Sequence, residues 1–393
     1  MRSEFMDYPI QESSTTKNKQ KFSSNSFDMR DWLMPKRLTM LMWDYAFLTR
    51  HMKGDSFEDY DKVLDEALER GYNTIRIDPM PHVIDLSQPE KICSRGALET
   101  KPLHPWDRPQ SFEGPLGEWL IEFMEKVINK NINYCLSAWS AEVEPDKKPQ
   151  SLRDITDMWK VMLREWKKRF GFNNCLYVDL SNEYPYFLND HLDRTIAKSN
   201  ERWSREWNEY IKIEVNTCLS ELREEFPELR FMVSLHGDVR WIDLDLELDV
   251  MDIHFYADAD TRFNDRTLFG KKCGDFFVDE TLYKDFSDRC IKSHKAMAPM
   301  YRARQRNKLA AFAAWSQESG IPLLTTESWS SWYYLDHKDL DWSWLLDWAE
   351  WSVEDAIEFK MWGWTPHNYC QPQFANWKDV KWHQRLTDKF LRS

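Results

Sequence analysis

Two glutamates stand where apolar segments of the sequence end. LYVDLSNEYP (176–185) turns polar at Asn182 and Glu183, and IPLLTTESWSSW (321–332) turns polar at Glu327. A single glutamate at such a position is usually a solvated loop residue, but two of them at corresponding ends of apolar segments could meet. Two carboxyl groups that meet are what cleavage of a glycosidic bond requires, since one protonates the leaving oxygen and the other, ionised, attacks or stabilises the sugar cation. Their surroundings must hold the two pKa values apart.

Other apolar segments also end in polar or aromatic side chains. Arg76 suits a place beside the attacking carboxylate, because a neighbouring cation favours the charged form. His254 and Tyr256 alternate onto one face of their segment, and Tyr256 is placed to donate a hydrogen bond to that carboxylate. Further candidates for substrate binding, all at or near the ends of such segments, are Trp43, Asp44, Trp139, His236, Trp329 and Trp364.

Asn182 and Glu183 pose a geometric problem. Adjacent residues on a regular strand point to opposite faces of the sheet. Both side chains reach one ligand only if the strand bends or bulges at its end, which is common beside active sites. We therefore expect irregular backbone at this position.

These side chains need a scaffold that gathers many strand ends. Eight apolar segments predict strands over 37–47, 73–79, 132–139, 175–183, 230–237, 248–256, 321–329 and 359–367. Helical periodicity predicts helices over 56–70, 115–130, 151–170, 199–225, 284–318, 340–356 and 379–391, with only short structure after the fifth strand. Apolar strands separated by helices indicate a parallel sheet. Eight such units predict a (β/α)8 TIM barrel of the α/β class, in which the carboxyl ends of the strands meet at one mouth.

A doubly wound open sheet is the alternative fold. The chain has only 11 Gly and no glycine-rich phosphate loop, which weighs against it. In the first predicted helix, 56–70, we expect Ser56 to be the N-cap and Gly71 to end the helix in the left-handed conformation.

Composition limits the partners. The net charge of −13 argues against nucleic acid or an anionic membrane as a partner, because both require a basic surface. No apolar run is long enough to cross a membrane, and no signal-peptide core opens the chain. The seven cysteines are scattered without metal-ligand spacing, so we expect reduced thiols, no metal, no cofactor and a cytoplasmic location.

The chain is expected to be one catalytic domain. Residues 1–36 are polar and read as an N-terminal tag and partly disordered extension, and 37–393 as the barrel. The chain holds 21 Trp, 22 Phe and 15 Tyr, more than a core alone accounts for. Such aromatic side chains suit a site that stacks on sugars, and surface tryptophans would also suit a homodimer.

The order of these motifs resembles that of the retaining glycoside hydrolases of clan A, most closely the cellulase-like family 5 and related families. The resemblance spans about 37–391 and is carried by GYNTIRI (71–77), Asn182-Glu183, HFY (254–256), Glu327 and Trp364. LSAWS (136–140) departs from it, because family 5 enzymes usually carry a polar pair with a histidine there.

The resemblance implies a role for each matching residue. Glu183 would be the acid/base and Glu327 the nucleophile of a double displacement on β-glycosides. It further implies that Asn182 binds the sugar 2-hydroxyl, Arg76 and Tyr256 orient Glu327, His254 serves the acid/base, and Trp364 forms the floor under the cleaved sugar. Together with the expected cytoplasmic location, this favours small oligosaccharides as substrates.

Two other functions stay open. Glu183, His236, Asp252, His254 and Glu327 could ligate a divalent metal for sugar isomerisation or hydrolysis. Alternatively, the barrel binds carbohydrate without catalysis. The identity of the sugar and exo against endo action are not readable from the sequence.

Overall fold

The computed structural model describes residues 35–95, 111–140, 149–185, 202–257, 260–268, 279–331 and 334–393. Nearly all of them belong to one compact unit, Lys36–Ser393. The predicted extension, residues 1–36, lies almost wholly outside the described residues, so its nature and boundary stay a prediction. Within the described ranges, no helix is long and apolar enough to cross a membrane.

The central feature is one parallel sheet of nine short strands. They are β1 (Leu38–Asp44), β2 (Thr74–Ile77), β5 (Asn133–Ser137), β6 (Cys175–Asp179), β7 (Phe231–Met232), β8 (Leu235–His236), β9 (Met251–His254), β10 (Leu323–Leu324) and β11 (Gly363–Trp364). Their order in the sheet is β7-β6-β5-β2-β1-β11-β10-β9-β8.

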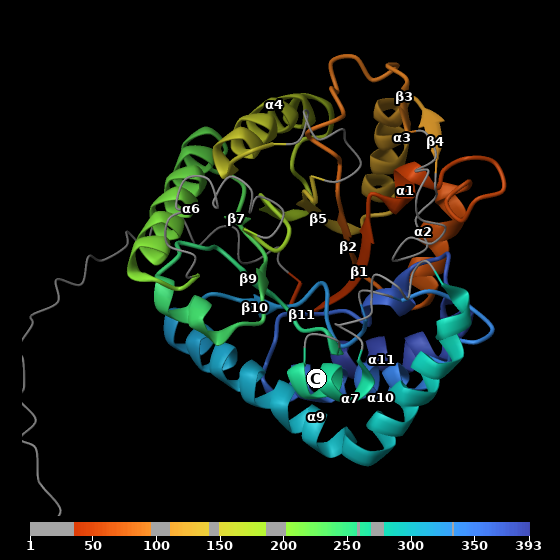
Figure 1. Ribbon diagram of the computed structural model, residues 1–393. Coiled ribbons are helices and arrows are strands. Elements are labelled where there is room, and N and C mark those ends of the chain that lie inside the picture. The colour runs from red at the N-terminus through yellow and green to blue at the C-terminus, as the bar shows by residue number, and fades with distance from the viewer. Residues whose placement is uncertain are drawn as a thin grey trace, which may run out of the picture. The chain divides into compact units, whose positions relative to one another are not determined.

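The sheet closes on itself through its fifth strand. β7 pairs with β6 and β8 pairs with β9, yet only two residues, Val233 and Ser234, separate β7 from β8. The two ends of the sheet, β7 and β8, are thus halves of a single interrupted strand. Counted in this way, the closed sheet has eight strands. Figure 1 shows the strands at the centre and the helices around them. The predicted (β/α)8 TIM barrel is confirmed.

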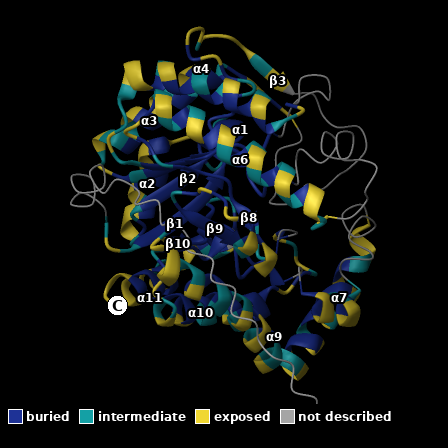
Figure 2. Ribbon diagram, turned by 90° about the vertical axis from the view of Figure 1, so that its left-hand side faces the viewer, coloured by how far each residue is buried: buried dark blue, intermediate teal, exposed yellow. Residues whose placement is uncertain are grey.

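Helices surround the strands in the expected order. They are α1 (Ala46–Thr49), α2 (Tyr60–Glu69), α3 (Leu116–Asn129), α4 (Leu152–Phe170), α6 (Arg205–Glu225), α7 (Thr261–Thr267), α9 (Tyr283–Ser319), α10 (Ser343–Glu358) and α11 (Val380–Leu391). Figure 2 shows exposed residues on their outer faces and buried residues towards the strands. Apolar burial against the barrel is therefore what holds each amphipathic helix in place.

Shorter elements complete the loops. They are the 3₁₀ helices η5 (Val239–Leu244), η7 (Glu280–Leu282), η8 (His367–Cys370) and η9 (Ala375–Lys378), and an antiparallel hairpin of β3 (Cys93–Arg95) and β4 (Phe112–Gly114). η5 follows the fifth strand, where only short structure was predicted. The hairpin and the short helices α1 and α7 were not predicted.

Local capping corrects one prediction and confirms another. Ser56 is not the N-cap of α2: the helix begins at Tyr60, and the side chain of Asp59 accepts from Lys62 N at 3.0 Å. Gly71 follows the helix with φ of 81°, the left-handed conformation that was predicted. Ser56 and Asp59 are both good N-caps, so sequence alone does not choose between them.

Candidate active site

Arg76 lies at the centre of the polar network inside the barrel mouth. It projects from β2 and is fully buried. Its Nη1 donates to Glu327 Oε1 at 2.6 Å, and its Nη2 lies 2.7 Å from Asp179 Oδ2 and 2.6 Å from Asn182 Oδ1. Burial alone would lower the pKa of Arg76, but the carboxylates of Glu327 and Asp179 outweigh it and raise that pKa. The guanidinium is a permanent cation that links strands β2, β6 and β10.

Asp179, Ser137 and Ser234 all contact Nη2 of Arg76 and hold the guanidinium in place. Asp179 ends β6 and accepts hydrogen bonds from Ser137 Oγ at 2.7 Å, Ser234 Oγ at 2.8 Å and Ser234 N at 2.9 Å. Sequence reasoning missed these three residues. The available signal was Asp179 itself, because a carboxyl group within a buried strand must find partners.

Glu327 is the better anchored of the two glutamates. It follows β10 and is fully buried. Besides the bond from Arg76, its Oε2 accepts a hydrogen bond from the hydroxyl of Tyr256, which lies just beyond β9. Two donors from two other strands fix the direction in which this carboxylate faces.

Glu183 reaches the mouth through irregular backbone. β6 ends at Asp179, four residues earlier, and Glu183 has a positive φ of 50°. Its backbone N–H donates to Ser234 Oγ at 2.9 Å instead of continuing the sheet. The expected distortion is therefore present, and Asn182 and Glu183 both face the centre of the barrel mouth.

Two histidines flank the carboxyl group of Glu183. His254 Nδ1 lies 2.9 Å from Oε1, and His236 Nε2 lies 3.2 Å from Oε2. His254 is buried, whereas the side chain of His236 is 42% exposed. Burial would raise the pKa of Glu183, but the charges of His236 and His254 outweigh it and lower that pKa.

His254 carries the proton of this group. Burial would lower its pKa, but the carboxylates of Glu327 and Asp252 overcome that effect and raise the pKa of His254 to about 10. Its Nε2 lies 3.6 Å from Asp252 Oδ1 and 3.3 Å from Thr326 Oγ1. The backbone N–H and the hydroxyl of Thr326 in turn donate hydrogen bonds to Asp252. The ring is thus held from behind by β9 and by the end of β10.

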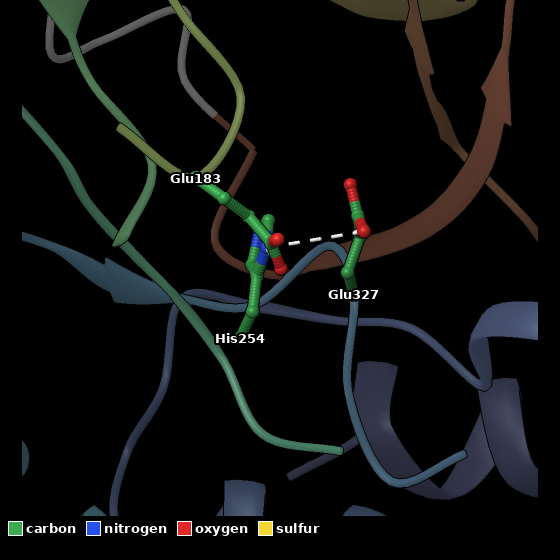
Figure 3. A group of neighbouring side chains, drawn as sticks. All are labelled: Glu183, His254 and Glu327. Atoms are coloured by element: carbon green, nitrogen blue, oxygen red, sulfur yellow. Dashed lines mark hydrogen bonds and ion pairs between the residues drawn. The ribbon is translucent and has the colours of Figure 1, made fainter. Parts of the chain in front are cut away.

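The two glutamates face one another across this ring. Glu183, His254 and Glu327 each offer an atom such that all three atoms lie within 4.8 Å of one another. Figure 3 shows the imidazole beside the carboxyl group of Glu183, with Glu327 opposite. Carboxyl groups about 5 Å apart are typical of retaining glycosidases, whereas inverting enzymes leave ~6.5–9.5 Å.

Trp139 lies against Arg76. The guanidinium carbon is 4.3 Å from the centre of the indole ring, a cation–π contact. The backbone N–H of Trp139 donates to Asp78 Oδ2 at 2.9 Å. Burial raises the pKa of Asp78 to about 7, against the opposing effect of its backbone hydrogen bonds. Trp139 is therefore part of the network, and a direct sugar contact stays a prediction.

The structure contradicts two predicted substrate-binding tryptophans. Trp364 does not form the floor of the site: its Nε1 donates to Ser352 on α10 at 2.6 Å and its ring packs near Phe390 on α11. Trp43 likewise packs edge-on against Phe57, and its Nε1 donates to the Cys370 carbonyl at 2.8 Å. Both indoles fill the layer between barrel and helices, because each points outward from its strand.

Two other candidates lie at the mouth without a defined sugar-binding role. Asp44 has a φ of 43° and accepts from Ala46 N at 2.5 Å, which starts α1. Trp329 is buried with a φ of 56°, and its N–H donates to the Phe255 carbonyl at 2.7 Å. Their part in substrate binding stays a prediction.

A divalent metal would have to use Glu183, His254 and Glu327, the group of possible ligands found among the described residues. Both oxygens of Glu327 already accept hydrogen bonds from Arg76 and Tyr256. Both ring nitrogens of His254 also have partners, Glu183 Oε1 at 2.9 Å and Thr326 Oγ1 at 3.3 Å. The cation at this site is Arg76, so the residues present do not favour a metal.

Comparison with known proteins adds the following. A family model described as "sugar-binding cellulase-like" matches residues 40–391. A protein of Parabacteroides distasonis, described only as a candidate glycoside hydrolase, has a solved structure that superposes with a TM-score of 0.78 at 29% identity, covering 91% of this chain and 94% of that one. No protein of the curated set matches the sequence.

More distant structures share the fold. An endocellulase of Pyrococcus horikoshii gives a TM-score of 0.50 at 13% identity, covering 90% of this chain and 93% of that one. A structure of the endocellulase of the same organism in complex with cellotetraose gives a TM-score of 0.50 at 14% sequence identity and covers the same shares of the two chains. At these identities the likeness is one of fold alone.

Proposed function

The chain belongs to the sugar-binding cellulase-like family, and on that premise we propose that it is a retaining glycoside hydrolase that cleaves β-glycosidic bonds of small oligosaccharides. The observation that carries the proposal is the pair of carboxyl groups within 4.8 Å, each with different partners. Glu327 is held by Arg76 and Tyr256, and Glu183 by His254 and His236.

In the first step Glu327 attacks the anomeric carbon. A glycosyl–Glu327 ester bond forms, the glycosidic C–O bond breaks, and Glu183 gives a proton to the leaving oxygen. Asn182 is oriented for the 2-hydroxyl, because its Oδ1 is engaged by Arg76 and its amide N–H groups are thereby left to donate. A hydrogen bond to that hydroxyl strengthens as the transition state forms.

The proton for this step comes from the pair of Glu183 and His254. In the free protein the proton resides on His254, since the pKa of Glu183 is lowered and that of His254 is raised to about 10. Transfer over the 2.9 Å between Nδ1 and Oε1 gives neutral His254 and protonated Glu183. Esterification of Glu327 removes the negative charge that raises the pKa of His254, so this transfer and the attack favour one another.

In the second step Glu183, now ionised, takes a proton from water. The water oxygen attacks the anomeric carbon, the ester bond breaks, and the sugar leaves with its original β configuration. The proton returns to the Glu183–His254 pair, and Glu327 is again held by Arg76 and Tyr256. No cofactor is required.

The test is a panel of aryl β-glycosides of glucose, galactose, mannose and xylose, with the anomer of the first product read by NMR. We expect a β product from wild type, and a Glu327→Gln variant that loses at least ~10³-fold in kcat while it still binds sugar. Glu318→Gln, an exposed glutamate on α9, is the matched control and should keep full activity. An α product, or an active Glu327→Gln variant, contradicts the proposal.

The same panel separates the two other functions. A metal enzyme would lose activity on treatment with a chelator, whereas we expect no change. A binding protein without catalysis would bind sugar but turn over none of the glycosides.

A further inference from the structure

A cavity of about 300 Å³ lies directly beside the Glu183–His254 pair. His236, His254, Phe255 and Tyr256 form one wall, and residues 237–239, Asp260 before α7 and three residues of α9 form the rest. The wall belongs to the side of the mouth that holds Glu183, since His236 Nε2 contacts Glu183 Oε2 at 3.2 Å. Arg76, which holds Glu327 on the other side, takes no part in it.

Most charged groups of the cavity are already paired. Arg304 Nε donates to Asp260 Oδ2 at 2.6 Å, and Asp260 is buried as the N-cap of α7. Asp238 accepts from the guanidinium of Arg240 with both oxygens. These pairs form a fixed polar rim and leave little net charge.

Two side chains of α9 that line the cavity, Gln305 and Lys308, offer hydrogen-bond donors that these pairs do not use. Gln305 is only 8% exposed and lines the cavity, and within the described residues its side-chain amide has no hydrogen-bond partner. Lys308 also lines the cavity and has no ion-pair partner within 4 Å among those residues. They stand three residues apart, on one face of the helix. No amide atom of Gln305 is among the buried side-chain atoms that lack a partner, so the amide reaches the cavity and can donate to a ligand hydroxyl there.

We propose that this cavity is the subsite for the leaving group, that it takes a single sugar residue, and that Gln305 and Lys308 hydrogen-bond to the hydroxyls of that residue. The inference rests on the proposed function, because the acid/base side of a glycosidase is the side from which the leaving group departs. The volume is near the lower end of small-molecule pockets, ~300–1,000 Å³, which suits one residue and not an extended chain. α9 thus sets the length of substrate beyond the cleaved bond.

The experiment compares substrates that differ in whether they fill the cavity. Cellobiose and β-1,4-mannobiose place a sugar there, whereas β-glucosyl and β-mannosyl fluoride have a one-atom leaving group. We expect kcat/KM on the disaccharides to fall by ~3- to 10-fold for Gln305→Ala, which removes a neutral hydrogen bond, and by ~10- to 100-fold for Lys308→Met, which removes a charged donor. Activity on the fluorides should stay within about twofold of wild type. Asn307→Ala, an exposed neighbour on α9, is the control and should change neither.

The outcomes separate this inference from the proposed function. An equal loss on fluorides and disaccharides, or no loss on either, overturns the subsite. A Glu327→Gln variant that still hydrolyses the fluorides overturns the proposed mechanism instead. If wild type turns over none of these substrates, calorimetric titration with the disaccharides decides: weaker binding by Lys308→Met and Gln305→Ala supports the subsite, and unchanged binding overturns it.

Discussion

At the scale of single residues, the site is organised by cations placed against carboxylates. Arg76 fixes Glu327 and Asp179, and protonated His254 lies between Glu183, Asp252 and Glu327. Buried charges are tolerated only when paired and hydrogen-bonded, so these groups depend on one another. Removing one group should change the behaviour of the others.

Tyr256→Phe tests the orientation of Glu327, the proposed nucleophile. The change removes one donor to Glu327 Oε2 and leaves the ring. A hydrogen bond to a charged group contributes ~1.5–3 kcal/mol, so we expect kcat/KM on aryl β-glycosides to fall by roughly 10- to 100-fold. Tyr60→Phe is the control: it removes an equally buried hydroxyl, bonded to the Phe47 carbonyl at 2.9 Å away from the mouth. Equal effects of both variants on turnover would refute the assigned role.

The protonated state of His254 predicts how stability depends on pH. A group with a raised pKa in the folded state binds its proton more tightly there, so its contribution is full below its unfolded pKa. For His254 that contribution is lost as pH rises from about 6.5 to about 10. The free energy of unfolding, measured by denaturant titration, should fall across this window and fall less in His254→Asn. The same slope in both proteins would show that another group is responsible.

At the scale of elements, sequence predicted where the strands lie better than which face each side chain occupies. All eight strands of the barrel, with β7 and β8 counted as one, fall within predicted segments. Apolar runs between helices are a strong signal for buried strands. Trp43 and Trp364 were misplaced because strands of two to seven residues, with a register shift in β1 between Met42 and Asp44, do not keep a simple alternation. Glu183, His254 and Glu327 were brought together as expected, whereas Ser137 and Ser234 are small residues whose role appears only in three dimensions.

Gly237 shows how tightly the ends of β8 and β9 are packed. A Cβ at this position would lie 2.2 Å from ring atoms of Phe255 and 3.1 Å from the His254 carbonyl. Overpacking of this kind costs ~1–3 kcal/mol, so Gly237→Ala should lower the melting temperature and displace the adjacent His236. Because Phe255→Ala removes the clash but also a buried ring, thermal unfolding of the double variant should show a loss smaller than the sum of the two single losses. Strictly additive losses in the double variant would contradict the contact.

At the scale of the whole molecule, Lys36–Ser393 forms one compact unit that contains every residue of the proposed site. Many charged side chains on the outer faces of the helices form surface ion pairs, and each pair contributes little by itself. Stability should therefore come mainly from apolar burial between barrel and helices.

A protein that begins at Lys36 should consequently fold and act like the full chain. We expect its melting temperature to stay within a few degrees and its kcat on the best aryl glycoside to be unchanged. Scanning calorimetry and a standard rate assay check this. A large drop in either would mean that residues 1–35 belong to the catalytic unit.

The interruption of the fifth strand has a consequence for folding. Ser234 lies between β7 and β8, and its backbone N–H and its hydroxyl donate hydrogen bonds to Asp179. The same hydroxyl accepts a hydrogen bond from the backbone N–H of Glu183. Ser234 therefore lies where the barrel closes and also positions Glu183, the proposed proton donor. Recovery of activity during refolding would then report closure of the barrel. A refolding chain should regain turnover only when β7 has paired with β6 and β8 with β9, and later than it regains its helix content.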